Sequence, residues 1–292
     1  MAEIDKPRTL QYCFLHQRLR KGDIVRLLSD ATQAGRWLAV LILAVFIAAV
    51  EAWGGAASVQ AAEIKVLSAG AVKDIVAELA ASFRQETGHT IVLSSGTAGE
   101  IRQKVTAGDP ADVVFVTDTV LEQLAATGLL VADSRADIAR TGIGVAVREG
   151  APLPDISTPE AFKRTVLAAK SIVYMDPARG ATSGIHFAGV LQRLGIADAV
   201  KDKTVLWYGS FASEALVKGQ ADLCVHQISE ILPVKGVTLV GPLPRDLQKI
   251  TTYSAALSTR AATPAPARAF IAFVTRPSFK AKFAAAGLDY RE

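Results

Sequence analysis

The feature that most constrains the fold is a regular alternation of short β-branched segments with amphipathic segments, starting at residue 64. Residues 64–67, 90–93 and 112–116 have the pattern of strands, and apolar residues recur at helical spacing between them. Gly88 and Gly108 mark the ends of the first two helices. This order of elements predicts an α/β fold in which a mostly parallel sheet is flanked by helices.

A second α/β unit follows a proline-rich stretch at residues 151–159. Its predicted strands and helices occupy residues 159–168, 171–175, 185–194, 204–207, 211–218, 223–226 and 237–240. Extended runs at 143–147 and 251–258 flank this unit. We therefore predict two lobes, residues 62–143 plus 251–292 and residues 144–250, each with a mostly parallel sheet and joined by two crossing strands that form a hinge.

The composition excludes several classes of protein. The chain has 292 residues, of which 50% are hydrophobic and 21% charged, so it is globular and not disordered. A net charge of +4 without a cluster of Lys and Arg argues against a nucleic-acid partner. The two cysteines and four histidines are scattered and match no metal-ligand spacing. We expect neither a cofactor nor a metal cation.

The N-terminal region contains a run of 14 apolar residues at positions 37–50, preceded by Arg36. A membrane-spanning helix needs about 20 such residues, so the run fits the apolar core of a secretory signal better. Small residues follow, and we predict cleavage after Ala61. Residues 1–61 are thus an N-terminal extension and signal peptide of a periplasmic protein, with an uncleaved anchor as the alternative.

The turns from predicted strand to predicted helix are rich in Ser, Thr and Gly. Helix N-termini present unpaired N–H groups and a partial positive charge, glycine allows close approach of a ligand, and hydroxyls add donors. Together these groups can hold an oxyanion without a Lys or Arg. Ordinary helix capping is the alternative for any single turn. The candidate turns are residues 67–71, 94–99, 176–184, 209–211 and 227–229.

The motifs of common enzymes are missing from these turns. There is no GxSxG elbow of a serine hydrolase, and residues 180–184 lack the lysine of a phosphate-binding P-loop. The turns also lack an evident nucleophile with its base. We therefore expect a binding protein and not an enzyme, with an enzyme on the same fold as a remote alternative.

Four stretches resemble the periplasmic molybdate-binding proteins of ABC importers, which have the type II solute-binding fold. They are residues 64–88, 94–116, 174–196 and 215–231, and the most specific is AGDPADVVF at 107–115. The resemblance implies a tetrahedral oxyanion held between two lobes by hydroxyls and backbone N–H groups. It also implies delivery of that anion to a membrane permease with its ATPase, by a protein that we expect to be a monomer.

The same resemblance assigns individual contacts. The second turn places Thr97 and Ala98 at the ligand, the third places the backbone N–H of Ser183 there, and the fourth places Ser210. The sequence departs from the family at Ala71, where a serine is expected, and at Gln227, where a tyrosine is expected. The full set of expected ligand-binding residues is Ser68, Ala69, Ser95, Thr97, Ala98, Ser183, Ser210 and Gln227. Molybdate or tungstate is the first expectation, and another inorganic anion or a small organic acid is the alternative.

Overall fold

The computed structural model describes residues 61–290, whose strands form two sheets. Residues 1–60, which make up all but the last residue of the predicted signal peptide, lie outside the described residues. The six-stranded sheet has the order β11-β4-β10-β3-β1-β2, with β1 Glu63–Ala69, β2 Thr90–Gly96, β3 Val113–Thr117, β4 Ala136–Thr141, β10 Thr251–Leu257 and β11 Asp289–Tyr290. The five-stranded sheet has the order β7-β6-β8-β5-β9, with β5 Ile143–Arg148, β6 Ile172–Met175, β7 Thr204–Trp207, β8 Leu223–Gln227 and β9 Val237–Pro242.

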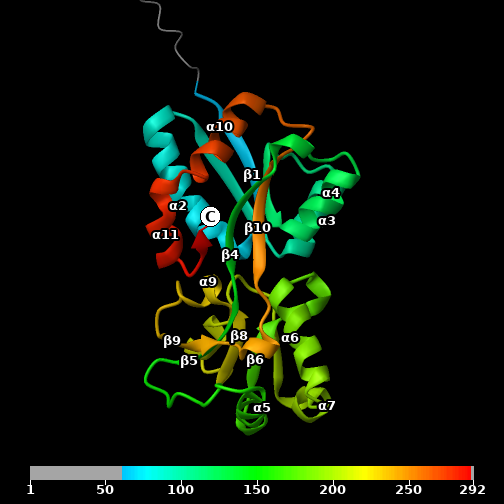
Figure 1. Ribbon diagram of the computed structural model, residues 1–292, viewed down its shortest axis with the longest axis vertical. Helices are drawn as coiled ribbons and strands as arrows, with labels where there is room; N and C mark the ends of the chain where they lie inside the picture. The colour runs from blue at the N-terminus through cyan, green and yellow to red at the C-terminus, as the bar shows by residue number, and fades with distance from the viewer. Residues whose placement is uncertain (1–60, 291–292) are drawn as a thin grey trace, which may run out of the picture. The chain divides into compact units, whose positions relative to one another are not determined.

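Helices flank both sheets (Figure 1). The α-helices are α2 Gly70–Thr87, α3 Ala98–Ala107, α4 Asp118–Ala126, α5 Pro159–Ala168, α6 Thr182–Arg193, α7 Ala197–Val200, α8 Glu214–Val217, α9 Ile228–Ile231, α10 Pro264–Val274 and α11 Lys280–Ala285. Short 3₁₀ helices lie at Ala132–Ser134, Pro177–Arg179, Lys201–Lys203, Arg245–Leu247 and Pro277–Phe279. No helix within residues 61–290 combines the length and the apolar character needed to span a bilayer.

The expectation of mostly parallel sheets is correct only for part of each sheet. Strand β1 pairs in parallel with β2 and β3, and β6 pairs in parallel with β7 and β8, as βαβ units require. The other pairs are antiparallel, so both sheets are mixed. Apart from the pair of β11 with β4, each antiparallel pair contains β5 or β10, which carry the chain from one sheet to the other and run opposite to their neighbours. Strand β4 was not predicted from the sequence.

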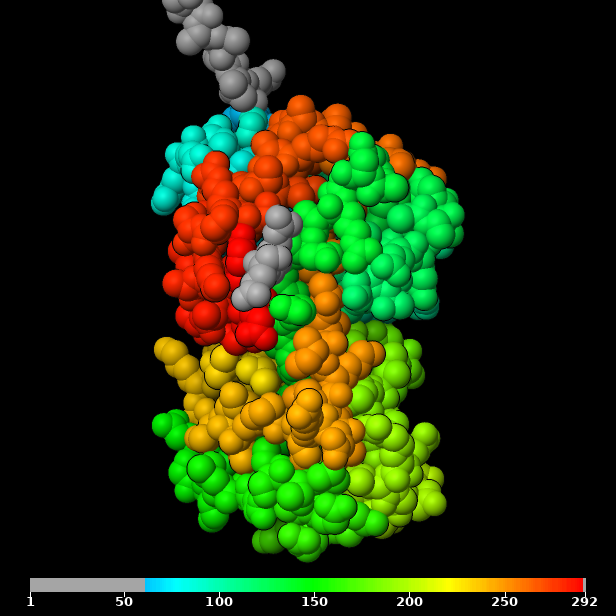
Figure 2. Space-filling view, in the orientation of Figure 1, coloured from blue at the N-terminus to red at the C-terminus, as the bar shows by residue number. Residues whose placement is uncertain are grey.

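Apolar residues from both ends of the described chain build the core of the six-stranded sheet. Helices α2, α10 and α11 cover one face, and α3 and α4 cover the other. Phe83 of α2 packs against Phe270 and Phe273 of α10, with ring centroids 5.1 and 5.2 Å apart. The space-filling view accordingly shows early residues in cyan beside late residues in orange and red (Figure 2). The C-terminal helices therefore complete this sheet.

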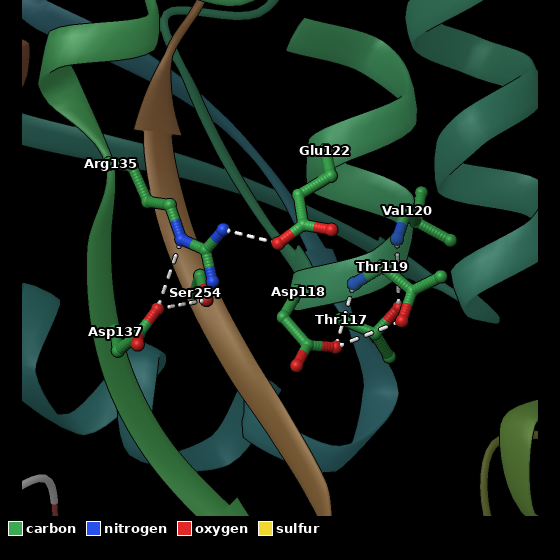
Figure 3. Close-up of polar contacts among 8 residues, drawn as sticks. All are labelled: Thr117, Asp118, Thr119, Val120, Glu122, Arg135, Asp137 and Ser254. Carbon is green, nitrogen blue, oxygen red and sulfur yellow. Dashed lines mark hydrogen bonds and ion pairs between the residues drawn. The ribbon is translucent and has the colours of Figure 1, made fainter. Parts of the chain in front are cut away.

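The strands β4 and β10 lie side by side and are tied by polar side chains (Figure 3). Ser254 Oγ donates to Asp137 Oδ1 at 2.6 Å, and Arg135 bridges Asp137 and Glu122. The register of β10 against β4 shifts between Tyr253 and Ser254. Such a shift increases local twist and redirects side chains, here beside the cavity that Tyr253 helps to line.

Candidate functional site

A cavity of about 260 Å³ is lined by the ends of strands from both sheets. Its walls come from the turns after β1, β2, β6, β7 and β8, together with Tyr253 of β10. The volume lies near the lower end of small-molecule sites, which are roughly 300–1,000 Å³. These are the turns in which the sequence placed its candidate residues.

Seven of the eight expected residues line this cavity: Ala69, Ser95, Thr97, Ala98, Ser183, Ser210 and Gln227. Ser68 does not. It is fully buried in β1, and its hydroxyl donates to the carbonyl of Ala69 at 3.0 Å. Alternate residues of a strand point to opposite faces, so the residue next to a cavity-lining position turns away from the cavity.

The Thr97 hydroxyl is engaged in two hydrogen bonds inside the protein. It accepts from the N–H of Glu100 at 3.1 Å and donates to the carbonyl of Arg179 at 2.6 Å. The Glu100 carboxylate in turn accepts from the N–H of Thr97 at 2.8 Å, which completes a capping box for α3. Thr97 therefore caps a helix of one sheet and also bonds to a turn of the other.

Arg179 strengthens this connection between the two sheets. Its guanidinium pairs with Glu100 and donates to the carbonyl of Tyr208. Close by, the N–H of Gly99 donates to the carbonyl of Gly180 at 3.1 Å. Burial opposes ionisation of Glu100, but the Thr97 N–H and the Arg179 guanidinium outweigh it and hold the pKa of Glu100 below its ordinary value. Glu100 is therefore an ionised structural partner.

The opposite wall of the cavity holds buried polar atoms without partners. The hydroxyl of Ser183 lies 3.1 Å from Nδ1 of His226, while Nε2 of His226 is buried and has no hydrogen-bond partner. Gln227 donates from Nε2 to the Tyr253 hydroxyl at 3.2 Å, and its Oε1 is left unpaired. Buried polar atoms are normally hydrogen-bonded, so unpaired atoms in a cavity wall point to a ligand or water.

Glu230 is the most unusual side chain of this wall. It belongs to α9, but its carboxylate reaches the start of α2, where a Cβ placed on Gly70 would lie 2.5 Å from Oε1. Burial raises the pKa of Glu230 to about 8, the charge of Lys73 opposes this rise, and that of Asp74 adds to it. The carboxyl group is therefore largely protonated at neutral pH.

His226 lies beside this carboxyl group, with its Nδ1 3.7 Å from Oε2 of Glu230. Burial lowers the pKa of His226 to about 3, so the imidazole is neutral at physiological pH. With a neutral imidazole and a mostly protonated carboxyl, the contact is not an ion pair. Both groups can exchange hydrogen bonds with a ligand, and the carboxyl can also exchange a proton.

Two long helices start at the cavity without a side-chain cap. Helix α2 follows Ala69 and α6 follows Ala181, and neither N-cap residue makes a side-chain hydrogen bond. Their first N–H groups and the positive ends of their dipoles are thus available to anions. Lys73 adds a formal positive charge to the lining, whereas the charge of Arg179 is balanced by its partner Glu100. Anionic groups can therefore bind at separate points of the cavity.

Sequence reasoning missed six of the residues in the lining: Lys73, Glu100, Arg179, His226, Glu230 and Tyr253. Lys73, Glu100 and Glu230 lie in the first turn of a helix that follows a predicted ligand turn, and this position was the available signal. Tyr253 is brought in by β10 from a distant part of the sequence. Within residues 61–290, no group of three or more His, Cys, Asp or Glu side chains could hold a metal ion.

Comparison with known proteins identifies the family. The model of the bacterial extracellular solute-binding protein family matches residues 64–289. The chain is 32% identical over 217 residues to aconitate isomerase from a Pseudomonas species, covering 72% of this chain and 81% of that protein. It is 27% identical over 230 residues to the molybdate-binding protein ModA of Azotobacter vinelandii, covering 76% and 88% of the two chains.

Solved structures agree with this assignment at the level of the fold. The periplasmic molybdate-binding protein of Azotobacter vinelandii superposes with a TM-score of 0.67 and 24% identity, covering 78% of this chain and all of that one. The substrate-binding domain of a molybdenum ABC transporter from Clostridium difficile, described as putative, gives a TM-score of 0.61 at 18% identity, covering 80% of this chain and 100% of that chain.

The predicted α/β solute-binding fold and the kinship with molybdate-binding proteins are thereby confirmed. Most of these relatives are binding proteins, but one is an enzyme, so membership of the family does not by itself exclude catalysis. The chain belongs to the bacterial extracellular solute-binding protein family.

Proposed function

We propose that this solute-binding protein captures a small organic acid with two or three carboxylates in the cavity between its sheets. The observation that carries the proposal is the set of separate anion-binding points, namely the uncapped starts of α2 and α6 together with Lys73. A polycarboxylate places its charges several ångströms apart and can use these points at once. The tricarboxylate named for one relative, aconitate, is a ligand of this class.

Molybdate or tungstate is the rival ligand, favoured by the molybdate-binding relatives. That ligand relies on the hydroxyls of Ser68, Thr97 and Ser210 and on backbone N–H groups, including that of Ser183. Ser68 lies outside the cavity lining, and the Thr97 hydroxyl already donates to the carbonyl of Arg179. An oxyanion would therefore lose the Ser68 hydroxyl and would have to displace the bond made by Thr97. The geometry therefore favours the organic acid.

Isothermal titration calorimetry distinguishes the two ligands. We would titrate the purified protein with trans-aconitate, citrate, succinate, molybdate, tungstate and sulfate. We expect micromolar binding of at least one polycarboxylate and a weaker response to the inorganic anions. Losing a hydrogen bond to a charged group costs about 1.5–3 kcal/mol, so Lys73→Met should weaken polycarboxylate binding roughly ten- to a hundredfold.

Lys235→Met is the matched control, since Lys235 is exposed and lies outside the cavity lining. It should bind polycarboxylates like the wild type. Tight binding of molybdate with no response to any polycarboxylate would overturn the proposed ligand class.

We propose further that the protein is exported, matures near Ala62, and delivers its ligand as a monomer to an ABC permease and its ATPase in the membrane. The apolar run at residues 37–50 and the family support this role. Sequencing the N-terminus of the protein from the periplasmic fraction is the test. An intact N-terminus in the membrane fraction would contradict export with cleavage.

A second candidate function is isomerisation of an unsaturated polycarboxylate. It is favoured by Glu230, a titratable carboxyl group in the cavity wall, and by the relative named as aconitate isomerase. Chromatography of trans-aconitate incubated with the protein should then show cis-aconitate, and the same equilibrium ratio should be reached from cis-aconitate. Binding of trans-aconitate without any conversion would leave the protein a carrier only.

A further inference from the structure

Two glutamates line the same cavity in opposite environments. Glu100 is held by the Thr97 N–H and by Arg179, and its carboxylate is committed to these partners. Glu230 projects from α9, the short helix that follows β8, and no hydrogen bond to its carboxyl oxygens is present within residues 61–290. Pairs of titratable groups with such different surroundings are typical of acid–base sites, in which one group is fixed and the other exchanges a proton.

We propose that Glu230 is the catalytic base of this cavity, which removes a proton from a carbon atom of a bound unsaturated polycarboxylate and returns it to another carbon. The inference rests on the proposed ligand class and on the second candidate function. It assigns the chemistry to one residue of this chain and requires no cofactor.

The position of Glu230 suits this role. Its carboxyl group lies at the uncapped start of α2, where Gly70 leaves room for it and where a carboxylate of the ligand would also bind. The Glu230 carboxyl is therefore next to the carbon atoms that neighbour the bound carboxylate of the ligand. The lack of competing hydrogen bonds leaves the carboxyl oxygens free to approach a C–H group.

The groups around Glu230 set its proton affinity. Lys73 and Asp74 face it from α2, Cys224 and His226 from β8, and Tyr253 from β10. Burial raises the pKa of both the Cys224 thiol and the Tyr253 hydroxyl, so these two groups stay neutral. Since the pKa of Glu230 itself is about 8, its carboxylate is a stronger base than an exposed glutamate and is still partly ionised near neutral pH.

The proposed step balances without an oxidant or a reductant. Glu230 takes a proton from the CH₂ group next to the carbon–carbon double bond, and the C–H electron pair forms a new double bond to the central carbon. The electrons of the old double bond are delocalised onto its far carbon and the attached carboxylate. Protonated Glu230 then returns the proton to that far carbon. The double bond moves by one position, and the formula of the acid does not change.

Movement of the double bond tests the proposal directly, because a proton that Glu230 removes and returns need not exchange with solvent. Trans-aconitate is incubated with the protein, and its conversion to cis-aconitate is followed by proton NMR over time. General acid–base groups contribute about 10²–10⁴-fold to rates, so Glu230→Gln should slow conversion at least a hundredfold. Glu149→Gln, at an exposed position outside the cavity, is the matched control and should convert the acid like the wild type.

The pH profile adds a readout that does not depend on a variant. The wild-type conversion rate per bound ligand should rise with pH and level off above about 8, where Glu230 is ionised. A flat profile between pH 6 and 9, or conversion by Glu230→Gln at the wild-type rate, would overturn the assignment. Glu230→Asp keeps the carboxyl and should retain part of the activity.

Calorimetry on the same samples separates this inference from the proposed function. If the wild type binds trans-aconitate but does not convert it, the role of Glu230 as a base is wrong while the proposed ligand class stands. If no polycarboxylate binds, the proposed ligand class is wrong and the inference falls with it.

Discussion

The two walls of the cavity differ in how completely their polar atoms are hydrogen-bonded within the protein. On the wall formed by Thr97, Glu100 and Arg179, almost every polar atom has a partner within the protein, and the partners connect the two sheets. On the wall formed by His226, Gln227 and Glu230, buried polar atoms are unpaired and a carboxyl group is held away from water. The first wall therefore holds the two sheets in position. On the second wall, a ligand can supply the hydrogen bonds that the protein leaves unmade.

Because of this difference, variants in the two walls can test stability and ligand binding separately. Changes in the first wall should alter how the sheets hold together, because each removes a bond that exists without a ligand. Changes in the second wall should mainly alter ligand handling, and they should also relieve the cost of burying titratable groups.

The largest expected effect concerns the pH dependence of stability. The pKa of Glu230 rises from 4.5 to about 8 on folding, so the folded state binds more protons between these values. Stability is thus highest below pH 4.5 with respect to this group and is lost as pH rises through about 8. Glu230→Gln should remove this alkaline decline of roughly 2–5 kcal/mol, measured by urea unfolding from pH 5 to 9.

His226 gives the opposite sign at acid pH. Its pKa falls from 6.5 to about 3 on folding, so its contribution is present above pH 6.5 and is lost as pH falls through about 3. His226→Gln should flatten the acid side of the stability profile and leave the alkaline side unchanged. Equal slopes for the wild type and both variants would mean that the second wall carries no titrating group.

The next effect concerns the contact between Gly99 and Gly180. A Cβ on Gly99 would lie 2.7 Å from the carbonyl oxygen of Arg179 and from the Cα of Gly180, both backbone atoms. Overpacking of this kind costs about 1–3 kcal/mol, so Gly99→Ala should lower the free energy of unfolding by about that amount. Gly189→Ala is the control, because its Cβ would meet no atom within 4 Å. Urea unfolding of both variants makes the comparison.

A smaller effect is expected for the ion pair of the first wall. The side chains of Glu100 and Arg179 are 26% and 32% exposed, so solvent screens their attraction. Glu100→Gln should cost about 1 kcal/mol of stability, including part of the capping box. The loss should shrink in high salt, as chemical unfolding at two salt concentrations would show. A loss that does not depend on salt would assign the effect to capping alone.

The smallest effect is expected at Thr97. Thr97→Val keeps the shape and deletes the hydroxyl, which removes the cap of α3 and the bond to Arg179. The expected cost is about 1 kcal/mol in thermal or urea unfolding, and Thr97→Ser should recover most of it. A large loss of molybdate or tungstate affinity without any change in stability would instead indicate that the Thr97 hydroxyl contacts the ligand.

Most of the fold could be predicted from local patterns in the sequence. The apolar spacing of α2, the glycine after it and the β-branched strands β1 and β3 are each visible in a short window of sequence. Strand β4 was missed because ADIART alternates weakly, and its strand state depends on pairing with β10 and β11. Whether such a segment forms a strand depends on the strands with which it pairs in the folded protein.

The cavity was less predictable for the same reason. The turns that form it were found because helix starts rich in Ser, Thr and Gly have a local signature. Whether a hydroxyl faces the ligand or another part of the chain depends on contacts across the fold, as Thr97 and Arg179 show with a separation of 82 residues. The raised pKa of Glu230 likewise requires burial by α2 and β10, which a single stretch of sequence does not reveal.

A crystal structure of the protein soaked with trans-aconitate tests the central claim most directly. We predict the acid within the cavity, with one carboxylate at the start of α2, another at the start of α6, and a carbon atom beside the Glu230 carboxyl. Density for the acid outside the cavity, or a cavity that binds only a tetrahedral oxyanion at Thr97 and Ser183, would contradict the account.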